Sequence, residues 1–210
     1  MTAARSFVDP DGGPAITLDH HGADVAAMEL AAISVLQSVP AEVWDGTPPV
    51  PINWIVKELY GLHVMNHGDI ASVVGVKLDE GKTMSGLLLP DRGVILVDEG
   101  ELAKWPNRKR FTMAHELAHW ILHRDAPPSK ETPRATIISS DGVRNDDPLP
   151  LAEAEANAFA AALLLPAALF RPAFAACDGD FPTLIDEFAS TNAALERRSK
   201  TLGVGAANSA

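Results

Sequence analysis

The sequence predicts an α+β fold, in which one helix packs on a small, mostly antiparallel sheet and a helical C-terminal part follows. Short segments rich in β-branched residues lie between residues 62 and 99, and the turn Pro90-Asp91-Arg92-Gly93 joins two of them as a hairpin. Apolar residues recur at helical spacing before this region and dominate the chain after residue 151. Because 47% of the residues are apolar, the chain can bury a sizeable core.

We predict a single domain, since the sequence has no internal repeat and no Gly/Ser-rich linker. Residues 1–22, rich in Gly, Pro, Asp and His, and residues 205–210 are expected to be flexible tails. The domain between them, residues 23–204, has three expected parts: helices, the sheet and a histidine-containing helix at 23–123, a long polar loop at 124–150, and further helices at 151–204.

The expected elements can be placed in chain order. The first helix begins near Asp24, which is a suitable N-cap, and the second runs from about Pro51 to Tyr60, before Gly61. Pro106 opens a long helix that ends near His123, because proline is well tolerated in a first helical turn. The remaining expectations are strands at 62–67, 72–78, 85–90 and 93–99, a short strand at 135–139, and helices at 151–165, 183–188 and about 192–202.

The charge and cysteine content restrict the class of protein. The net charge of −11 argues against a generic nucleic-acid or anionic-membrane binder, which needs a basic surface. Cys177 is the single cysteine, which excludes an intrachain disulfide and a thiolate-rich zinc site. The N-terminus lacks an apolar signal region, and the longest apolar stretch, residues 156–170, is too short to cross a bilayer. We therefore expect a cytoplasmic protein.

The segment His115-Glu116-Leu117-Ala118-His119 fits the pattern H-E-x-x-H. Positions four apart lie about 40° apart on one helix face, so both imidazoles can reach one zinc ion. Glu116 is rotated by about 100° from His115, which suits a general base acting on a water molecule at the open side of the metal. The apolar residues around the motif place the histidines on a partly buried helix, where they need partners.

A catalytic zinc site needs a third protein ligand, and the helix at 151–166 offers Glu153 and Glu155. With Phe159 as the centre of its apolar face, Glu155 lies within about 60° of that centre, whereas Glu153 lies at about 120°. Glu155 is thus the expected third ligand, because a buried carboxylate needs a cation to offset its desolvation. The alternative for Glu155 is a buried salt bridge, to Arg110 or Arg171.

His123 lies four residues after His119 and is expected to face the same cleft. It could stabilise an oxyanion, or it could cap the C-terminus of the helix, where a partly positive side chain is favoured. The structural role is the preferred interpretation.

Two stretches, RFTMAHELAHWILHR and EAEANAFAAALLLP, together with the hairpin SGLLLPDRGVILVDE, resemble the ImmA/IrrE family of zinc metallopeptidases. The resemblance runs from about residue 50 to 204. It implies a zincin-like fold of the gluzincin type, with His115, His119 and Glu155 as zinc ligands and Glu116 as catalytic base. Members typically cleave a helix-turn-helix repressor encoded nearby, in phage, mobile-element or stress-response control, and others occur beside antitoxin-like regulators.

These observations predict a zinc-dependent endopeptidase that hydrolyses a peptide bond in a specific regulatory protein. The expected substrate is a helix-turn-helix repressor or an antitoxin-like partner, and no direct nucleic-acid or membrane binding is expected. The alternative is a non-enzymatic, zinc-containing regulator, or a toxin-like protein, that acts by binding a cognate partner.

Overall fold

The computed structural model describes residues 22–75, 77–78, 82–124, 135–139 and 150–205. The predicted tails, apart from residues 22 and 205, and most of the predicted loop at 124–150 lie outside this part of the chain.

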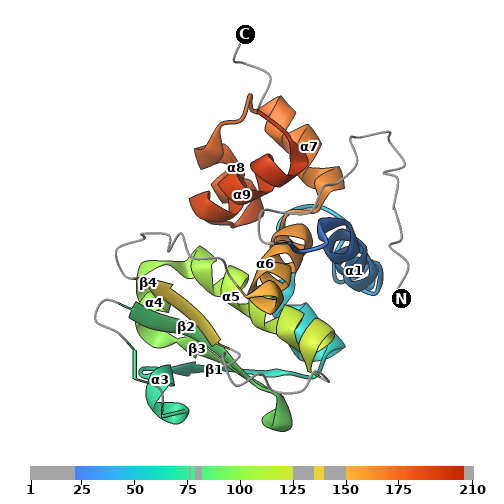
Figure 1. Ribbon diagram of the computed structural model, residues 1–210. Coiled ribbons are helices and arrows are strands. Elements are labelled where there is room, and N and C mark those ends of the chain that lie inside the picture. The colour runs from blue at the N-terminus through green and yellow to red at the C-terminus, as the bar shows by residue number, and fades with distance from the viewer. Residues whose placement is uncertain (1–21, 76, 79–81, 125–134, 140–149, 206–210) are drawn as a thin grey trace.

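A four-stranded mixed sheet forms one end of the molecule (Figure 1). Its order is β1-β3-β2-β4; β1 runs parallel to β3, and the other two pairings are antiparallel. The hairpin expected at Pro90 is present: η2 (Pro90–Arg92) joins β2 to β3, and Gly93 closes the turn with a φ of 60°, a conformation that glycine adopts readily. The strands are β1 (His63–His67), β2 (Lys82–Leu89), β3 (Val94–Asp98) and β4 (Ala135–Ser139).

A β-bulge in β2, between Met84 and Gly86, changes which side chains face which side of the sheet. Met84 and Leu87 pack with Ile70 under one face, where the short helix α3 (Ile70–Val73) lies. Gly86 faces the opposite side, toward α5 (Pro106–Ala118). Regular pairing with β3 turns Gly86 and Leu88 toward α5, and the bulge turns Met84 to the same face as Leu87.

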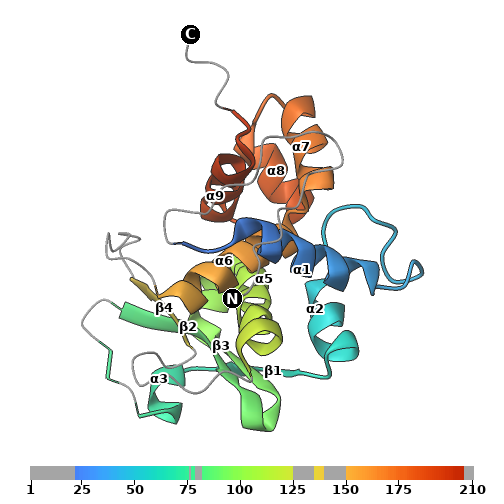
Figure 2. The ribbon, with the colours of Figure 1, turned by 45° about the vertical axis from the view of Figure 1, so that its right-hand side comes forward.

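The central helix α5 lies between the sheet and the other helices (Figures 1 and 2). It packs against β2 and β3 on one side and against α6 (Leu151–Leu164) on the other, and α6 in turn packs against α1 (Val25–Gln37). A π-helical turn, η3 (His119–His123), continues α5. The other helical elements are α2 (Ile52–Trp54), η1 (Ile55–Leu59), α4 (Glu99–Lys104), α7 (Ala167–Ala176), α8 (Phe181–Phe188) and α9 (Asn192–Leu202).

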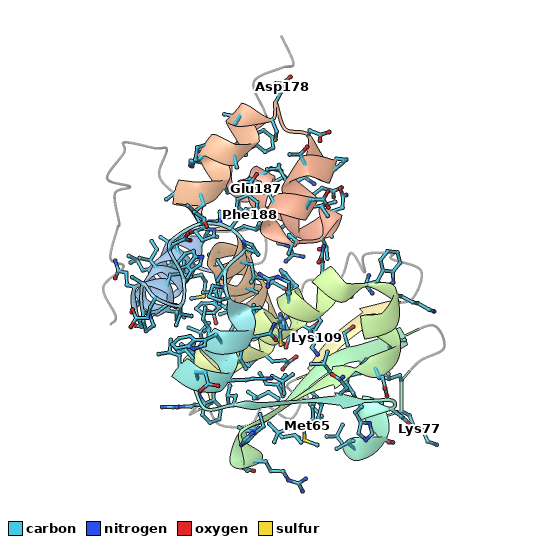
Figure 3. All side chains as sticks on the ribbon, turned by 180° about the vertical axis from the view of Figure 1, so that it is seen from behind. Met65, Lys77, Lys109, Asp178, Glu187 and Phe188 are labelled. Carbon is cyan, nitrogen blue, oxygen red and sulfur yellow. The ribbon has the colours of Figure 1, made fainter. Side chains whose placement is uncertain are left out.

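The C-terminal helices α7, α8 and α9 form a group at the end of the molecule opposite the sheet (Figure 1). Phe188 is buried where this group meets the rest of the chain, whereas Asp178 lies at its far tip (Figure 3). The group is tied to the N-terminal helix by a buried ion pair between Arg198 of α9 and Glu29 of α1. Arg198 also donates to the carbonyl of Leu165 at 2.7 Å, so one guanidinium connects α9, α1 and the end of α6.

The α+β class, the sheet and the helical C-terminal part are confirmed. The strand expected at 72–78 is wrong, because α3 occupies its first residues. The side chain of Asp69 accepts a hydrogen bond from the backbone N–H of Ser72 at 3.1 Å, and this N-cap outweighs the β-branched residues that follow. No single helix of the described chain is long and apolar enough to cross a membrane. Helices α6 and α7 together have the length and apolar composition of a membrane span, but they are bent by 64° relative to each other.

Candidate metal centre

His115 and His119 lie on the face of α5 and η3 that packs against α6. Their exposed fractions are 1% and 2%, so both imidazoles are removed from bulk water. The two Nε2 atoms lie 3.1 Å apart, and the rings meet edge to face with centroids 4.8 Å apart. The predicted convergence of the two histidines is therefore present.

The Glu153 carboxylate completes this cluster from the first turn of α6. Its Oε2 lies 3.1 Å from His115 Nε2, and its Oε1 lies 3.3 Å from His119 Nε2. Ligand atoms around a tetrahedral zinc ion with bonds of about 2.0–2.2 Å lie about 3.3–3.6 Å from one another. Two imidazoles and one carboxylate at nearly this spacing could hold a divalent metal ion, and the set is one that zinc commonly takes.

The pKa of Glu153 reflects the same contacts. Burial raises it, but the hydrogen bonds and charge interactions with His115 and His119 outweigh burial and lower the pKa from 4.5 to about 2. The carboxylate is therefore ionised at neutral pH, as a metal ligand must be.

The structure brings Glu153, and not the predicted Glu155, to the histidine pair. Glu155 is 24% exposed and its Oε2 lies 3.5 Å from His123 Nε2. Burial, followed by the nearby charge of Asp24, raises the pKa of Glu155, in contrast to the lowered pKa of Glu153. The alternative partner Arg110 instead donates to the carbonyl of Val50 at 2.7 Å.

The choice of Glu155 failed because α6 does not have one buried face. The helix packs against both α1 and α5, so it has buried apolar residues on more than one face. The position of Phe159 therefore does not identify the face that is directed toward the histidines. The face that carries Glu153, which the helical phase placed at about 120° from Phe159, also carries Asn157 and faces α5.

Glu116, the predicted general base, is fully buried. It lies against β2 at Gly86: a Cβ atom added to Gly86 would lie 2.9 Å from Glu116 Oε1 and 3.3 Å from its Cγ. The backbone of β2 thus lies against the Glu116 side chain, and only glycine leaves the carboxylate this space. Glu116 is not one of the three clustered donors, as its predicted angular offset from His115 requires.

His123 extends the histidine row by one more turn. Its ring centroid lies 5.5 Å from that of His119, and its Nε2 lies 3.5 Å from Oε2 of Glu155. It therefore borders the metal cluster without belonging to it.

From the sequence, Glu153 ranked below Glu155 as the third ligand, and Asn157 had no expected role. The Asn157 side-chain oxygen lies 3.3 Å from His115 Nδ1, the ring nitrogen that faces away from the cluster. The sequence signal for the shared position of Glu153 and Asn157 was their spacing: residues four apart on a helix lie on one face.

The family model for the IrrE N-terminal-like domain, Peptidase_M78, matches residues 76–200, which is more than half of the chain. The chain belongs to this family. The resemblance in the sequence is thereby confirmed, and membership identifies the chain with a family of the metallopeptidase type. The matched segment contains both histidines, Glu116 and Glu153.

This IrrE-like chain is also similar in fold to the solved structure of a Mycobacterium tuberculosis transcriptional regulator. The TM-score is 0.55 and the sequence identity 20%, and the similarity covers 90% of this chain and 51% of the regulator. The chain therefore spans about half the length of that protein. No protein of curated function matches the sequence.

Proposed function

We propose that this chain is a zinc-dependent endopeptidase that hydrolyses a peptide bond in a specific regulatory protein. The observation that carries the proposal is the set of three donors from two helices, His115, His119 and Glu153. The buried Glu116 follows His115 directly in the sequence. A zinc ion held there would supply Lewis acidity, which acidifies a water molecule and polarises a substrate carbonyl.

The protein's own side chains would then have two roles, proton transfer and metal binding. Glu116 takes a proton from the attacking water at its carboxylate and delivers it to the amine nitrogen of the departing peptide, as a general base followed by a general acid. Because Glu116 is buried against Gly86, its carboxylate has little freedom to move. His115, His119 and Glu153 remain ligands throughout and transfer no proton.

The substrate class follows from the family and the structural neighbour. The resemblance to ImmA/IrrE proteins implies a helix-turn-helix repressor or antitoxin-like partner, and the neighbour is itself a transcriptional regulator. We take the repressor encoded nearest to this chain as the first candidate substrate.

The test is incubation of the purified chain with that repressor, with and without a chelator, followed by mass spectrometry of the products. Wild type is expected to cleave at one site, and the chelator to stop cleavage. Glu116→Gln should retain zinc and lose cleavage, whereas Glu153→Gln should lose zinc. Glu155→Gln is the matched control from the same helix and should keep both.

A regulator that acts by binding is the second candidate, and the similarity to a transcriptional regulator favours it. This alternative predicts a stable complex with the repressor, unchanged in mass after incubation. Wild-type cleavage by Glu116→Gln would remove the general base from the proposal, and an intact repressor bound by the zinc-loaded wild type would favour the alternative.

A further inference from the structure

We infer that Asn157 is a positioning residue, which fixes the orientation and tautomer of His115 so that Nε2 presents its lone pair to the metal. This inference rests on the proposed metal centre, and it adds a residue that neither the motif nor the family match assigns. The evidence is the contact of 3.3 Å between His115 Nδ1 and Asn157 Oδ1.

The two nitrogens of His115 have different partners. Nε2 faces the cluster, at 3.1 Å from both His119 Nε2 and a Glu153 oxygen, and Nδ1 faces Asn157. A neutral imidazole carries its proton on one nitrogen only. If Nδ1–H donates to the Asn157 carbonyl oxygen, Nε2 keeps the lone pair that a metal requires.

Without Asn157 a competing arrangement becomes favourable. The proton would lie on Nε2 and donate to the Glu153 carboxylate, which is within hydrogen-bond distance. That tautomer cannot bind a metal through Nε2. The Asn157 carbonyl therefore favours the tautomer with Nδ1–H, which can bind a metal, whereas the Glu153 carboxylate alone favours the tautomer with Nε2–H, which cannot.

The position of Asn157 on α6 couples this selection to the third ligand. Glu153 and Asn157 lie four residues apart, so one helix face supplies both the carboxylate and the acceptor for His115. A shift of α6 along α5 would disturb both contacts together.

The amide also acts without adding charge. Two carboxylates, Glu116 and Glu153, are enough to balance the charge of a divalent ion. An aspartate at position 157 would still accept the Nδ1–H bond, but it would add a negative charge and make His115 a more basic ligand. Asn157→Asp should therefore retain or tighten zinc binding, whereas Asn157→Leu and Asn157→Ala should weaken it.

The first measurement is the dissociation constant for zinc, obtained by competition with a chromophoric chelator. Asn157→Leu is expected to raise the constant about 10–100-fold, and Asn157→Asp is expected not to raise it. Asn157→Ala serves as the second variant should leucine prevent folding, and Glu155→Gln is the control for a neutralised neighbour on α6. Wild-type zinc affinity in Asn157→Leu and Asn157→Ala would overturn the inference.

The second measurement needs no metal. Nitrogen-15 NMR of the His115 ring in the chelator-treated protein reports which nitrogen carries the proton. Asn157→Ala should show a larger Nε2–H population than wild type, because it has lost the acceptor for Nδ1–H; an unchanged population would also overturn the inference. If wild type binds no zinc, the proposed function fails, yet this measurement still decides the role of Asn157.

Discussion

Replacement of Gly86 by alanine tests how closely β2 approaches the general base. The new Cβ atom would lie 2.9 Å from Glu116 Oε1 and within van der Waals overlap of Thr112 Cγ2. Carbon atoms normally pack at about 3.5–4.0 Å, so β2 and α5 must separate by about 1 Å. Overpacking of this kind costs about 1–3 kcal/mol of the free energy of unfolding.

The same displacement should slow catalysis. A shift of about 1 Å in a catalytic group can cost about 100-fold in rate. We therefore expect Gly86→Ala to lower both the urea midpoint and the rate of repressor cleavage. The assays are chemical denaturation followed by tryptophan fluorescence, and single-turnover cleavage at saturating zinc.

A second substitution separates the two effects. Thr112→Ser removes the methyl group that the new Cβ meets, but it leaves the contact with Glu116. In Gly86→Ala/Thr112→Ser, stability should largely recover while cleavage stays slow. Gly68→Ala is the control, because a Cβ there meets nothing within 4 Å, and it should leave both quantities nearly unchanged.

Two results would refute this reasoning. Wild-type stability and cleavage in Gly86→Ala would show that the strand and helix separate freely. Full recovery of cleavage in the double variant would show that Thr112, and not the displacement of Glu116, limits the rate.

Three further predictions concern stability. Glu29→Gln leaves Arg198 buried without its carboxylate and should lower the free energy of unfolding by about 3–5 kcal/mol in urea denaturation; a loss below about 1 kcal/mol would contradict a buried pair. Because the folded pKa of Glu153 is lowered from 4.5 to about 2, the metal-free protein should hold this contribution, about 3 kcal/mol, above pH 4.5 and lose it as the pH falls toward 2. Denaturation at several pH values should show a steeper loss of stability in wild type than in Glu153→Gln, which keeps the contributions of carboxyl groups such as Asp45 and Asp180. Thr191→Ala removes the side-chain acceptor for the N–H of Ala194 at the start of α9 and should cost about 0.5–2 kcal/mol, with thermal unfolding as the readout.

Local patterns predicted the local features of the site. The approach of His115 and His119 depends only on helical spacing, and the hairpin at Pro90 depends on its own turn residues. Both are present, because no distant contact has to act on them.

The errors concern features that distant contacts decide. Glu153 faces the histidines because α1 and α5 both pack on α6, an arrangement that the phase of one helix cannot reveal. The pair of Glu29 and Arg198 joins residues 169 positions apart, and neither has a local pattern that marks it. The bulge that turns Met84 away from α5 likewise depends on pairing with β4.

The Arg198 contacts affect how much of the chain a fragment that carries the candidate metal centre must include. The family match begins at residue 76, yet α1, which packs along α6 and supplies Glu29, ends at Gln37. A fragment limited to the matched residues would contain every candidate ligand. It would lack α1, however, and would expose the side of α6, the helix that carries Glu153, against which α1 packs.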